Sequence, residues 1–238
     1  MADRRDLTLA VAQPATATHD LAGNAGRHAD LVRRSGARIV GFPELSLTGY
    51  DMAVTAVDPA DPRLGPLVRA CAETGAIAFA GAPVAADGGG RHIATLLVDG
   101  TGARVAYRKR FLGGAEPAAF VPGPEPVVVE VDGWRIGLAI CRDTGVARHD
   151  HDLATLGIDV YLAGVVEHAA DRAVPGDRAR RIATDHGVWV AIASCAGGTG
   201  AGYDRTAGGS AVRRPDGTVA AAAGTAAGEV VSATVPSR

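Results

Sequence analysis

Aromatic side chains are scarce in this chain: Phe, Trp and Tyr make up 4% of its 238 residues, although 47% of the residues are hydrophobic. A chain of this length can bury a sizeable core, which must then consist mainly of Ala, Val, Leu and Ile. Long apolar runs are also missing, since no stretch approaches the ~18 consecutive apolar residues that a membrane-spanning helix needs. The run from Leu7 to Ala12 is too short for the core of a signal peptide. We therefore expect no membrane partner.

The chain also lacks a strong net charge and any long basic tract. Its formal net charge is -2, and basic and acidic residues are mixed along the sequence. The densest basic clusters, Arg108–Arg110 and Arg178–Arg181, are short, and the second is interpreted as a solvated face. Nucleic-acid binding requires a concentrated positive surface. We therefore expect no nucleic-acid partner.

Cysteine is rare as well, with three residues at positions 71, 141 and 195. An odd number of cysteines argues against a disulfide framework, and free thiols favour a reducing compartment. We therefore expect a cytoplasmic protein. Cys71 lies in a helical pattern and Cys195 at the end of an apolar strand, so both are predicted to be structural.

Short apolar strands alternate with amphipathic helical stretches along the chain, which predicts a layered α/β fold. Tight turns at Asp99–Gly102 and Asp132–Gly133 indicate hairpins, and so mixed rather than purely parallel sheets. No linker or repeat interrupts the pattern, so residues 1–238 are expected to form a single domain. The expected strands are 7–13, 38–42, 76–82, 92–98, 103–107, 127–131, 134–140, 159–163, 188–194, 210–213 and 218–222, and the expected helices are 21–35, 62–74, a stretch after 141, and 171–186.

Cys141 directly follows an apolar strand and precedes the residues Arg142-Asp143-Thr144-Gly145. A strand-to-helix turn can present a nucleophile above the edge of a sheet and direct backbone N–H groups at an oxyanion. A helix that starts just after the turn, with Asp143 or Thr144 as its cap, would also favour the thiolate. The alternative is a buried and inert cysteine, which is the commoner role of a free cysteine taken alone.

Glu44 follows the strand 38–42 and lies in the segment GFPELSLTGY. A carboxylate in such apolar surroundings has a raised pKa, which suits a general base. The alternative is a glutamate that begins a helix after Pro43 and interacts favourably with the helix dipole.

Lys109 lies between Arg108 and Arg110, just after the strand 103–107. A lone lysine is usually solvated, but successive side chains of a strand point to opposite faces. Lys109 can therefore face inward while its two neighbours face outward. A thiol, a carboxylate and an ammonium group are together the parts needed to attack a carbon–nitrogen bond through a covalent acyl-enzyme.

These three residues and their surroundings closely resemble the nitrilase superfamily, the carbon–nitrogen hydrolases. The segments FPELSLTGY, AYRKRFL and WRIGLAICRDTG carry the resemblance, which extends over nearly the whole chain. It implies a four-layer α-β-β-α sandwich with mixed sheets and a homodimer or larger homo-oligomer. It also implies that Glu44 is the general base, that Cys141 is the nucleophile, and that Lys109 stabilises the tetrahedral intermediate.

Three further site residues follow from the same resemblance. Glu116, in the segment EPAAFVPG, matches a second active-site acid that would hold Lys109 charged and oriented; the alternative is an acid on a surface loop. Arg142 would supply a backbone N–H to the oxyanion, and Tyr50 would contribute to oxyanion or substrate binding. The Arg142 side chain would either point into the pocket, to bind a substrate carboxylate or exclude cations, or face solvent.

The residues after the cysteine bear on the substrate. True nitrilases usually have Trp-Glu there, whereas this chain has Arg142-Asp143, which favours amides over nitriles. The sequence therefore predicts a hydrolase of a small amide, an ω-amide or an N-carbamoyl compound. Two alternatives stay open: an N-acyltransferase that uses the same triad, and a non-catalytic family member that acts as a binding or assembly module.

Motifs for cofactors and metals are weak. Gly198-x-Gly200 lacks the third glycine of a dinucleotide-binding fingerprint, because Tyr203 occupies that position, and no Walker lysine follows. The run His149–Asp152 suggests a metal site, but no CxxC or HExxH motif accompanies it. It is therefore interpreted as the exposed start of a helix, and we expect neither a cofactor nor a metal.

Overall fold

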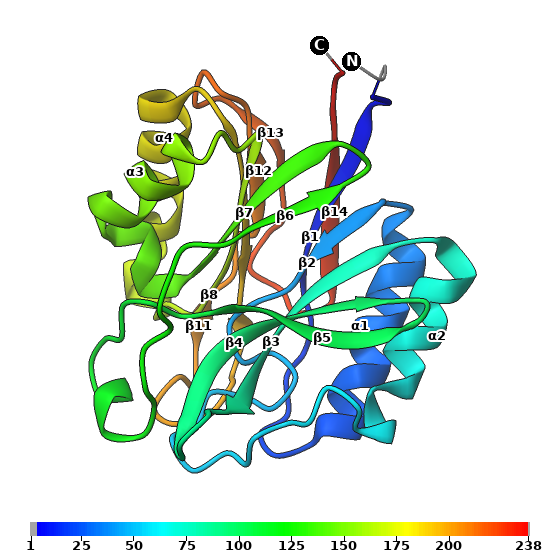
Figure 1. The fold of residues 1–238 in the computed structure, drawn as a ribbon, viewed down its shortest axis with the longest axis vertical. Coiled ribbons are helices and arrows are strands. Elements are labelled where there is room, and N and C mark those ends of the chain that lie inside the picture. Colours follow the sequence, from blue (N-terminus) through cyan, green and yellow to red (C-terminus); the bar gives the residue numbers. More distant parts are fainter. Residues whose placement is uncertain (1–3, 238) are drawn as a thin grey trace.

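Two six-stranded sheets pack face to face in the computed structural model, which describes residues 4–237 (Figure 1). In spatial order, the first sheet contains β14 (Glu229–Val235), β1 (Leu7–Gln13), β2 (Ile39–Gly41), β3 (Ile77–Ala85), β4 (Arg91–Asp99) and β5 (Gly102–Arg108). The second contains β13 (Val219–Ala222), β12 (Ala211–Arg213), β9 (Trp189–Ser194), β8 (Val160–Val165), β7 (Trp134–Ile140) and β6 (Val128–Val131).

Helices cover the outer face of each sheet, which completes an α-β-β-α sandwich (Figure 1). The first sheet carries α1 (Leu21–Ser35) and α2 (Gly65–Thr74), and the second carries α3 (Ala147–Thr155) and α4 (Ala173–His186). The short remaining elements are the strands β10 (Ala196–Gly197) and β11 (Thr206–Ala207) and the 3₁₀ turns η1 (Pro62–Leu64), η2 (Glu116–Ala118), η3 (Cys141–Gly145) and η4 (Ala169–Asp171).

Each sheet mixes parallel and antiparallel pairs, as predicted. The parallel pairs are β1 with β2, β2 with β3, β7 with β8, and β8 with β9. All other neighbours within the two large sheets are antiparallel. Because β4 is antiparallel to both its neighbours, β5 runs in the same direction as β2 and β3. The carboxyl ends of β2, β3 and β5 therefore lie at one edge of their sheet, where ligands commonly bind in α/β proteins.

The strand sequences explain why three apolar layers form. In β1, Leu9 and Val11 point toward the other sheet, whereas Ala10 and Ala12 point toward α1, as the two-residue period of a strand requires. Small alanines on the outer faces let the helices approach closely. The larger aliphatic side chains fill the space between the sheets, including Ile39, Phe79, Ile136, Leu138, Val160 and Leu162.

The four-layer mixed α/β fold implied by the resemblance is confirmed, and the elements β1, α1 and β7 have the predicted bounds. The prediction that the chain ends with two strands after residue 210 was wrong, because β14 follows and pairs antiparallel with β1 along its full length. The predicted helix 62–74 begins with the 3₁₀ turn η1, whereas the predicted helix 171–186 starts at the last residue of η4 and becomes α-helical at Ala173. The single-domain prediction also included residues 1–3 and 238, which lie outside the described residues.

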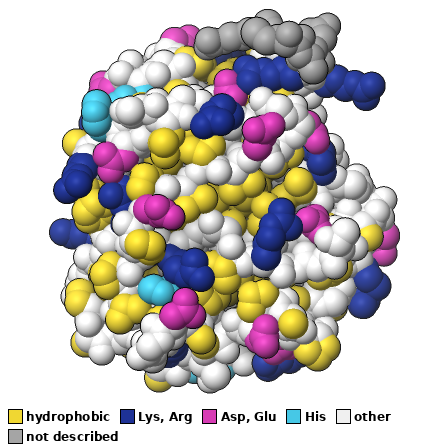
Figure 2. Space-filling model, in the orientation of Figure 1, with side chains coloured by type: hydrophobic (Ala, Val, Ile, Leu, Met, Phe, Trp, Pro, Cys, Tyr) yellow, Lys and Arg dark blue, Asp and Glu magenta, His cyan; other side chains and the backbone are white. Residues whose placement is uncertain are grey.

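The surface shown in Figure 2 has basic and acidic side chains interspersed over the same face. No helix within residues 4–237 is both long enough and apolar enough to span a membrane.

Candidate active site

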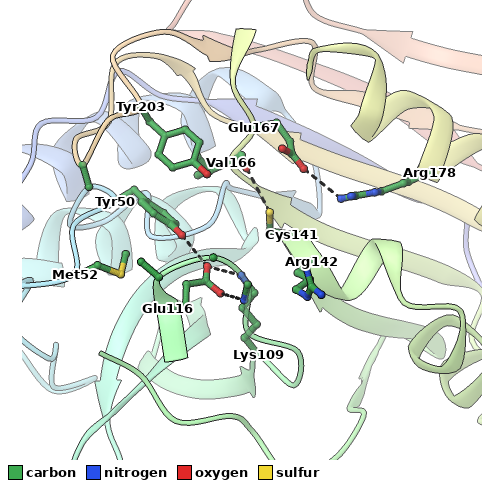
Figure 3. Close-up of a pocket in the computed structure, with 14 residues that line it drawn as sticks. Tyr50, Met52, Lys109, Glu116, Cys141, Arg142, Val166, Glu167, Arg178 and Tyr203 are labelled. Atoms are coloured by element: carbon green, nitrogen blue, oxygen red, sulfur yellow. Dashed lines mark hydrogen bonds and ion pairs between the residues drawn. The ribbon is translucent and has the colours of Figure 1, made fainter. Parts of the chain in front are cut away.

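The Cys141 side chain opens into a cavity of about 380 Å³ at the carboxyl end of β7 (Figure 3). Its backbone has a φ of 42°, a left-handed conformation that non-glycine residues rarely adopt. Such strain is maintained only where the surrounding structure fixes it, and it is common at functional sites. The Cys141 Sγ donates to the backbone oxygen of Val166, just after β8, at 3.3 Å.

The expectation that a helix start favours the Cys141 thiolate was wrong. The 3₁₀ turn η3 starts at Cys141 itself and is only five residues long, so it provides little dipole. Burial raises the pKa of the thiol above its usual value, and the Glu44 and Glu167 carboxylates raise it further, which outweighs the opposing effect of Lys109. The resting cysteine is therefore a thiol that needs a base to remove its proton.

Asp143 caps the 3₁₀ turn η3 through its bond from Ile140 N, and it also joins the Cys141 turn to the segment that carries Lys109. Its fully buried carboxylate accepts hydrogen bonds from Ile140 N at 2.9 Å, Phe111 N at 2.9 Å and the Tyr107 hydroxyl at 2.7 Å. Three donors from two chain segments thus converge on the Asp143 carboxylate, which fixes Cys141 relative to the end of β5. Sequence reasoning missed this role, because two of the donors are distant in the chain.

Glu44 lies in a turn directly after β2 and is 1% exposed. The turn is enclosed by glycines from both sheets. A Cβ atom at Gly81 of β3 would lie 2.4 Å from Pro43 O, and one at Gly164 of β8 would lie 2.9 Å from Glu44 N. Only glycine permits this approach. The general-base candidate is therefore held by backbone packing on two sides.

Two side chains of α1 bind the segment that follows Glu44. Asn24 Nδ2 donates to Leu47 O at 3.0 Å, and the His28 Nε2 atom lies 2.8 Å from Ser46 Oγ. Burial lowers the pKa of His28 to about 4, so this imidazole is neutral near pH 7. The turn therefore is fixed to α1 by neutral hydrogen bonds.

Lys109 is 1% exposed and points inward, as predicted from the strand alternation. Its Nζ atom donates to Glu44 Oε1 and to Glu116 Oε1, both at 2.7 Å. Burial acts to lower the pKa of Lys109, but the Glu44 and Glu116 carboxylates outweigh this effect and hold the pKa above its usual value. The lysine is therefore a buried cation, compensated by two carboxylates.

The Glu44 carboxyl group has one bonded and one free oxygen. Oε1 accepts from Lys109, whereas the buried Oε2 has no hydrogen-bond partner among residues 4–237. Burial raises the pKa of Glu44 to about 7; the nearby Glu116 charge adds to this effect, and Lys109 and Cys141 oppose it. A carboxyl group with a pKa near neutrality and a free oxygen can both accept and return a proton.

Glu116 lies beside Lys109 and not on an exposed loop, since it is 2% exposed. Its Oε1 accepts from Lys109 and from the Tyr50 hydroxyl at 2.8 Å, and its Oε2 accepts from Gly113 N at 2.8 Å. Tyr50 lines the cavity, but its hydroxyl group donates to Glu116. The structure thus brings together Glu44, Tyr50, Lys109, Glu116, Cys141 and Arg142, the six predicted site residues.

The cavity mouth carries a second ion pair that the sequence interpretation missed. Glu167 follows β8, and its carboxylate lies 3.2 Å from the Arg178 guanidinium of α4. Arg178 had been assigned to a solvated face, and that assignment was wrong, because the residue lines the cavity. A polar residue at the end of a buried parallel strand was the available signal for Glu167.

Residues 149–152 were predicted to form the exposed start of a helix, and this prediction was wrong. His149 and Asp150 are fully buried. The His149 Nε2 atom lies 3.1 Å from Leu138 O, and Asp150 accepts from Tyr161 at 2.9 Å and from Arg181 at 2.6 Å. These contacts give both side chains a structural role under β7 and β8.

Comparison with known proteins gives a family match over almost the whole sequence: residues 8–238 match the model described as carbon–nitrogen hydrolase. The hydrolase MT0498 of Mycobacterium tuberculosis is 32% identical over 224 residues, which cover 84% of this chain and 78% of the relative. A Pseudomonas protegens protein named as a hydrolase in the pqqF 5' region is 29% identical over 214 residues, covering 86% of this chain and 74% of the relative.

Among solved structures, the amidase NitN from Nesterenkonia sp. AN1 superposes with a TM-score of 0.84 at 25% identity, covering 97% of this chain and 93% of that chain. A cysteine-to-alanine variant of that amidase, in complex with butyramide, superposes with a TM-score of 0.85 at 24% identity, covering 98% and 92%. In another variant, the acetamide moiety of fluoroacetamide is covalently attached to the active-site cysteine.

Proposed function

The chain belongs to the carbon–nitrogen hydrolase family of the nitrilase superfamily, and on that premise we propose that it hydrolyses a small amide through a thioester on Cys141. One observation supports this most directly. A buried lysine joins two carboxylates at 2.7 Å, and the free oxygen of one of them lies in the same site as a cysteine thiol. These are the groups that covalent cleavage of an amide requires.

Acylation begins when Glu44 Oε2 takes the Cys141 proton and Sγ attacks the carbonyl carbon. The carbonyl oxygen becomes an oxyanion, which the Lys109 ammonium and the backbone N–H of Arg142 stabilise. Glu44 then gives its proton to the nitrogen, the carbon–nitrogen bond breaks, and ammonia or an amine leaves. The acyl group remains on sulfur as a thioester.

Deacylation uses the same groups with water as the nucleophile. Glu44 takes a proton from water while the oxygen attacks the thioester carbonyl, and the carbon–sulfur bond then breaks. The proton returns from Glu44 to the Cys141 sulfur as the carboxylic acid leaves. Glu116 remains bonded to Lys109 and Tyr50, and it keeps the ammonium group charged and oriented through both stages.

Ammonia release from a panel of short amides, ω-amides, N-carbamoyl amino acids and nitriles tests this function. We expect release from an amide or carbamoyl class, and an acyl-enzyme detectable by intact mass spectrometry. Cys141→Ala should abolish both signals. Cys71→Ala is the matched control, because Cys71 is a buried free cysteine of α2 that does not line the cavity.

Retained turnover in Cys141→Ala would refute the mechanism. An acyl-enzyme that forms without ammonia turnover, but yields a new amide when amines are added, would identify an acyltransferase. A protein that binds amides with neither adduct nor ammonia release would be a binding module instead.

We further propose that the protein is a cytoplasmic homodimer or larger homo-oligomer. Its three cysteines are all free, which suits a reducing compartment, and the family resemblance supports self-association. Light scattering coupled to size-exclusion chromatography would measure the oligomeric state, and a monomer would contradict this part of the proposal.

A further inference from the structure

Five charged side chains line the cavity, and four of them are paired. Lys109 is bonded to Glu116 at 2.7 Å, and Arg178 is bonded to Glu167 at 3.2 Å. Arg142 is the fifth, and its guanidinium forms neither an ion pair nor a hydrogen bond with any residue from 4 to 237. Arg142 is therefore the one charged side chain of the lining, among residues 4–237, without an ion-pair partner, and it lies beside Cys141.

The Arg142 side chain packs against Gly113, which also lines the cavity. A Cβ atom built on Gly113 would lie 3.0 Å from Arg142 Cδ and 3.7 Å from Nη1, so the aliphatic stem lies directly against this glycine. Gly113 belongs to the loop between Lys109 and Glu116, and its N–H donates to Glu116. Figure 3 shows Arg142 beside Cys141, on the side away from Tyr50 and Met52.

We propose that Arg142 binds a carboxylate at the far end of the substrate, so that the preferred substrates are primary amides that carry a second, anionic carboxyl group. The proposal rests on the function proposed above, because it names the substrate class of the same cavity. A guanidinium matches a carboxylate through two parallel hydrogen bonds, which gives direction as well as charge.

The same charge discriminates against other amides. A neutral amide of equal shape gains no contact with the guanidinium, and a cationic amide is repelled by it. A charge-assisted hydrogen bond in a partly enclosed site is worth about a tenfold difference in affinity. Because Arg142 is exposed, the preference should weaken as salt concentration rises.

Binding to the Cys141→Ala protein, measured by titration calorimetry, tests this preference without turnover. The probes are succinamate, its neutral isostere 4-methylpentanamide, and the cationic 4-aminobutanamide. We expect succinamate to bind about tenfold more tightly than the neutral isostere, and the cation to bind most weakly. Adding Arg142→Met should bring the ratio of the first two affinities to about one, whereas Arg142→Lys should keep part of it.

Arg148→Met in the same background is the matched control, because Arg148 is an exposed arginine on α3 outside the cavity. It should leave the succinamate preference in place. The proposal would be overturned if succinamate and its isostere bound equally tightly, or if succinamate did not bind. It would also be overturned if the ratio of their affinities were unchanged by Arg142→Met. Failure of hydrolysis is seen separately, as absence of ammonia release by the unaltered protein with every amide.

Discussion

Gly164 of β8 is predicted to position the general base, although it has no side chain and takes no part in the chemistry. A Cβ atom at this position would lie 2.6 Å from Phe42 O, 2.9 Å from Pro43 C and 2.9 Å from Glu44 N. All three are backbone atoms, so no side-chain rotation can relieve the overlap. The substitution Gly164→Ala should therefore push the Glu44 turn away from the second sheet.

The size of the displacement follows from the contacts. Ordinary van der Waals contact with a Cβ begins at 3.4 Å, so Phe42 O must recede by about 0.8 Å. A misplacement of about 1 Å in a catalytic group can reduce the rate about 100-fold. We expect kcat/KM to fall about 10- to 100-fold, and the free energy of unfolding to fall by about 1–3 kcal/mol because of overpacking.

The assay is kcat/KM for the best amide of the panel, at a temperature well below the midpoint of thermal unfolding, together with denaturant unfolding. Gly81→Ala should act in the same direction from the first sheet, because its Cβ would lie 2.4 Å from Pro43 O and Leu45 N. The matched control is Gly26→Ala in α1, where nothing lies within 4 Å of the added carbon. It should leave activity unchanged and increase stability by about 0.5–1 kcal/mol.

Wild-type kcat/KM in Gly164→Ala would refute this reasoning, whatever the change in stability. Equal losses in Gly164→Ala and in the Gly26→Ala control would do the same, since the effect would then not depend on contact with the Glu44 turn.

Three further predictions concern the buried charges. The pKa of Glu44 is raised to about 7, so kcat/KM should rise with pH and level off above pH 7. Glu116→Gln should shift this rise in kcat/KM to lower pH, because it removes a negative charge next to Glu44. The folded protein holds the Glu44 proton more tightly than the unfolded chain does, so the contribution of Glu44 to stability should decrease as pH rises from 4.5 to about 7. Urea unfolding at several pH values measures the free energy of unfolding. An increase of that contribution over this pH range would contradict the prediction. Lys109→Met leaves two buried carboxylates without their cation, so it should abolish turnover and lower the free energy of unfolding by about 3–5 kcal/mol. Adding Glu116→Gln to this variant should recover stability without activity, and a stable, active Lys109→Met protein would rule out the proposed role.

The sequence was most informative where chemistry depends on local context. The segments around Glu44, Lys109 and Cys141 each follow a predicted strand, and the structure ends β2, β5 and β7 at or just before them. Short apolar runs bounded by turns were sufficient to predict these strands. The structure then brings the three side chains together at one site, where these strands end.

The sequence was least informative about partners that are distant in the chain. β14 is mostly half-buried and lacks a continuous apolar run, and it is a strand because β1 offers a free edge for pairing. The burial of His149 and Asp150 depends on contacts with Leu138, Tyr161 and Arg181. No local pattern encodes such contacts.

The amino-acid sequence by itself predicted a layered α/β fold with mixed sheets and the candidate thiol, carboxylate and ammonium groups, because strand pattern, turns and residue type are local properties; the four layers were implied by the family resemblance. Only the tertiary structure decided their charge states. Burial raises the pKa of Glu44 and of the Cys141 thiol, and Lys109 remains a cation through two carboxylates that approach it from separate segments. Desolvation and Coulomb energy depend on distances in space, and those distances are fixed only when the two sheets pack together.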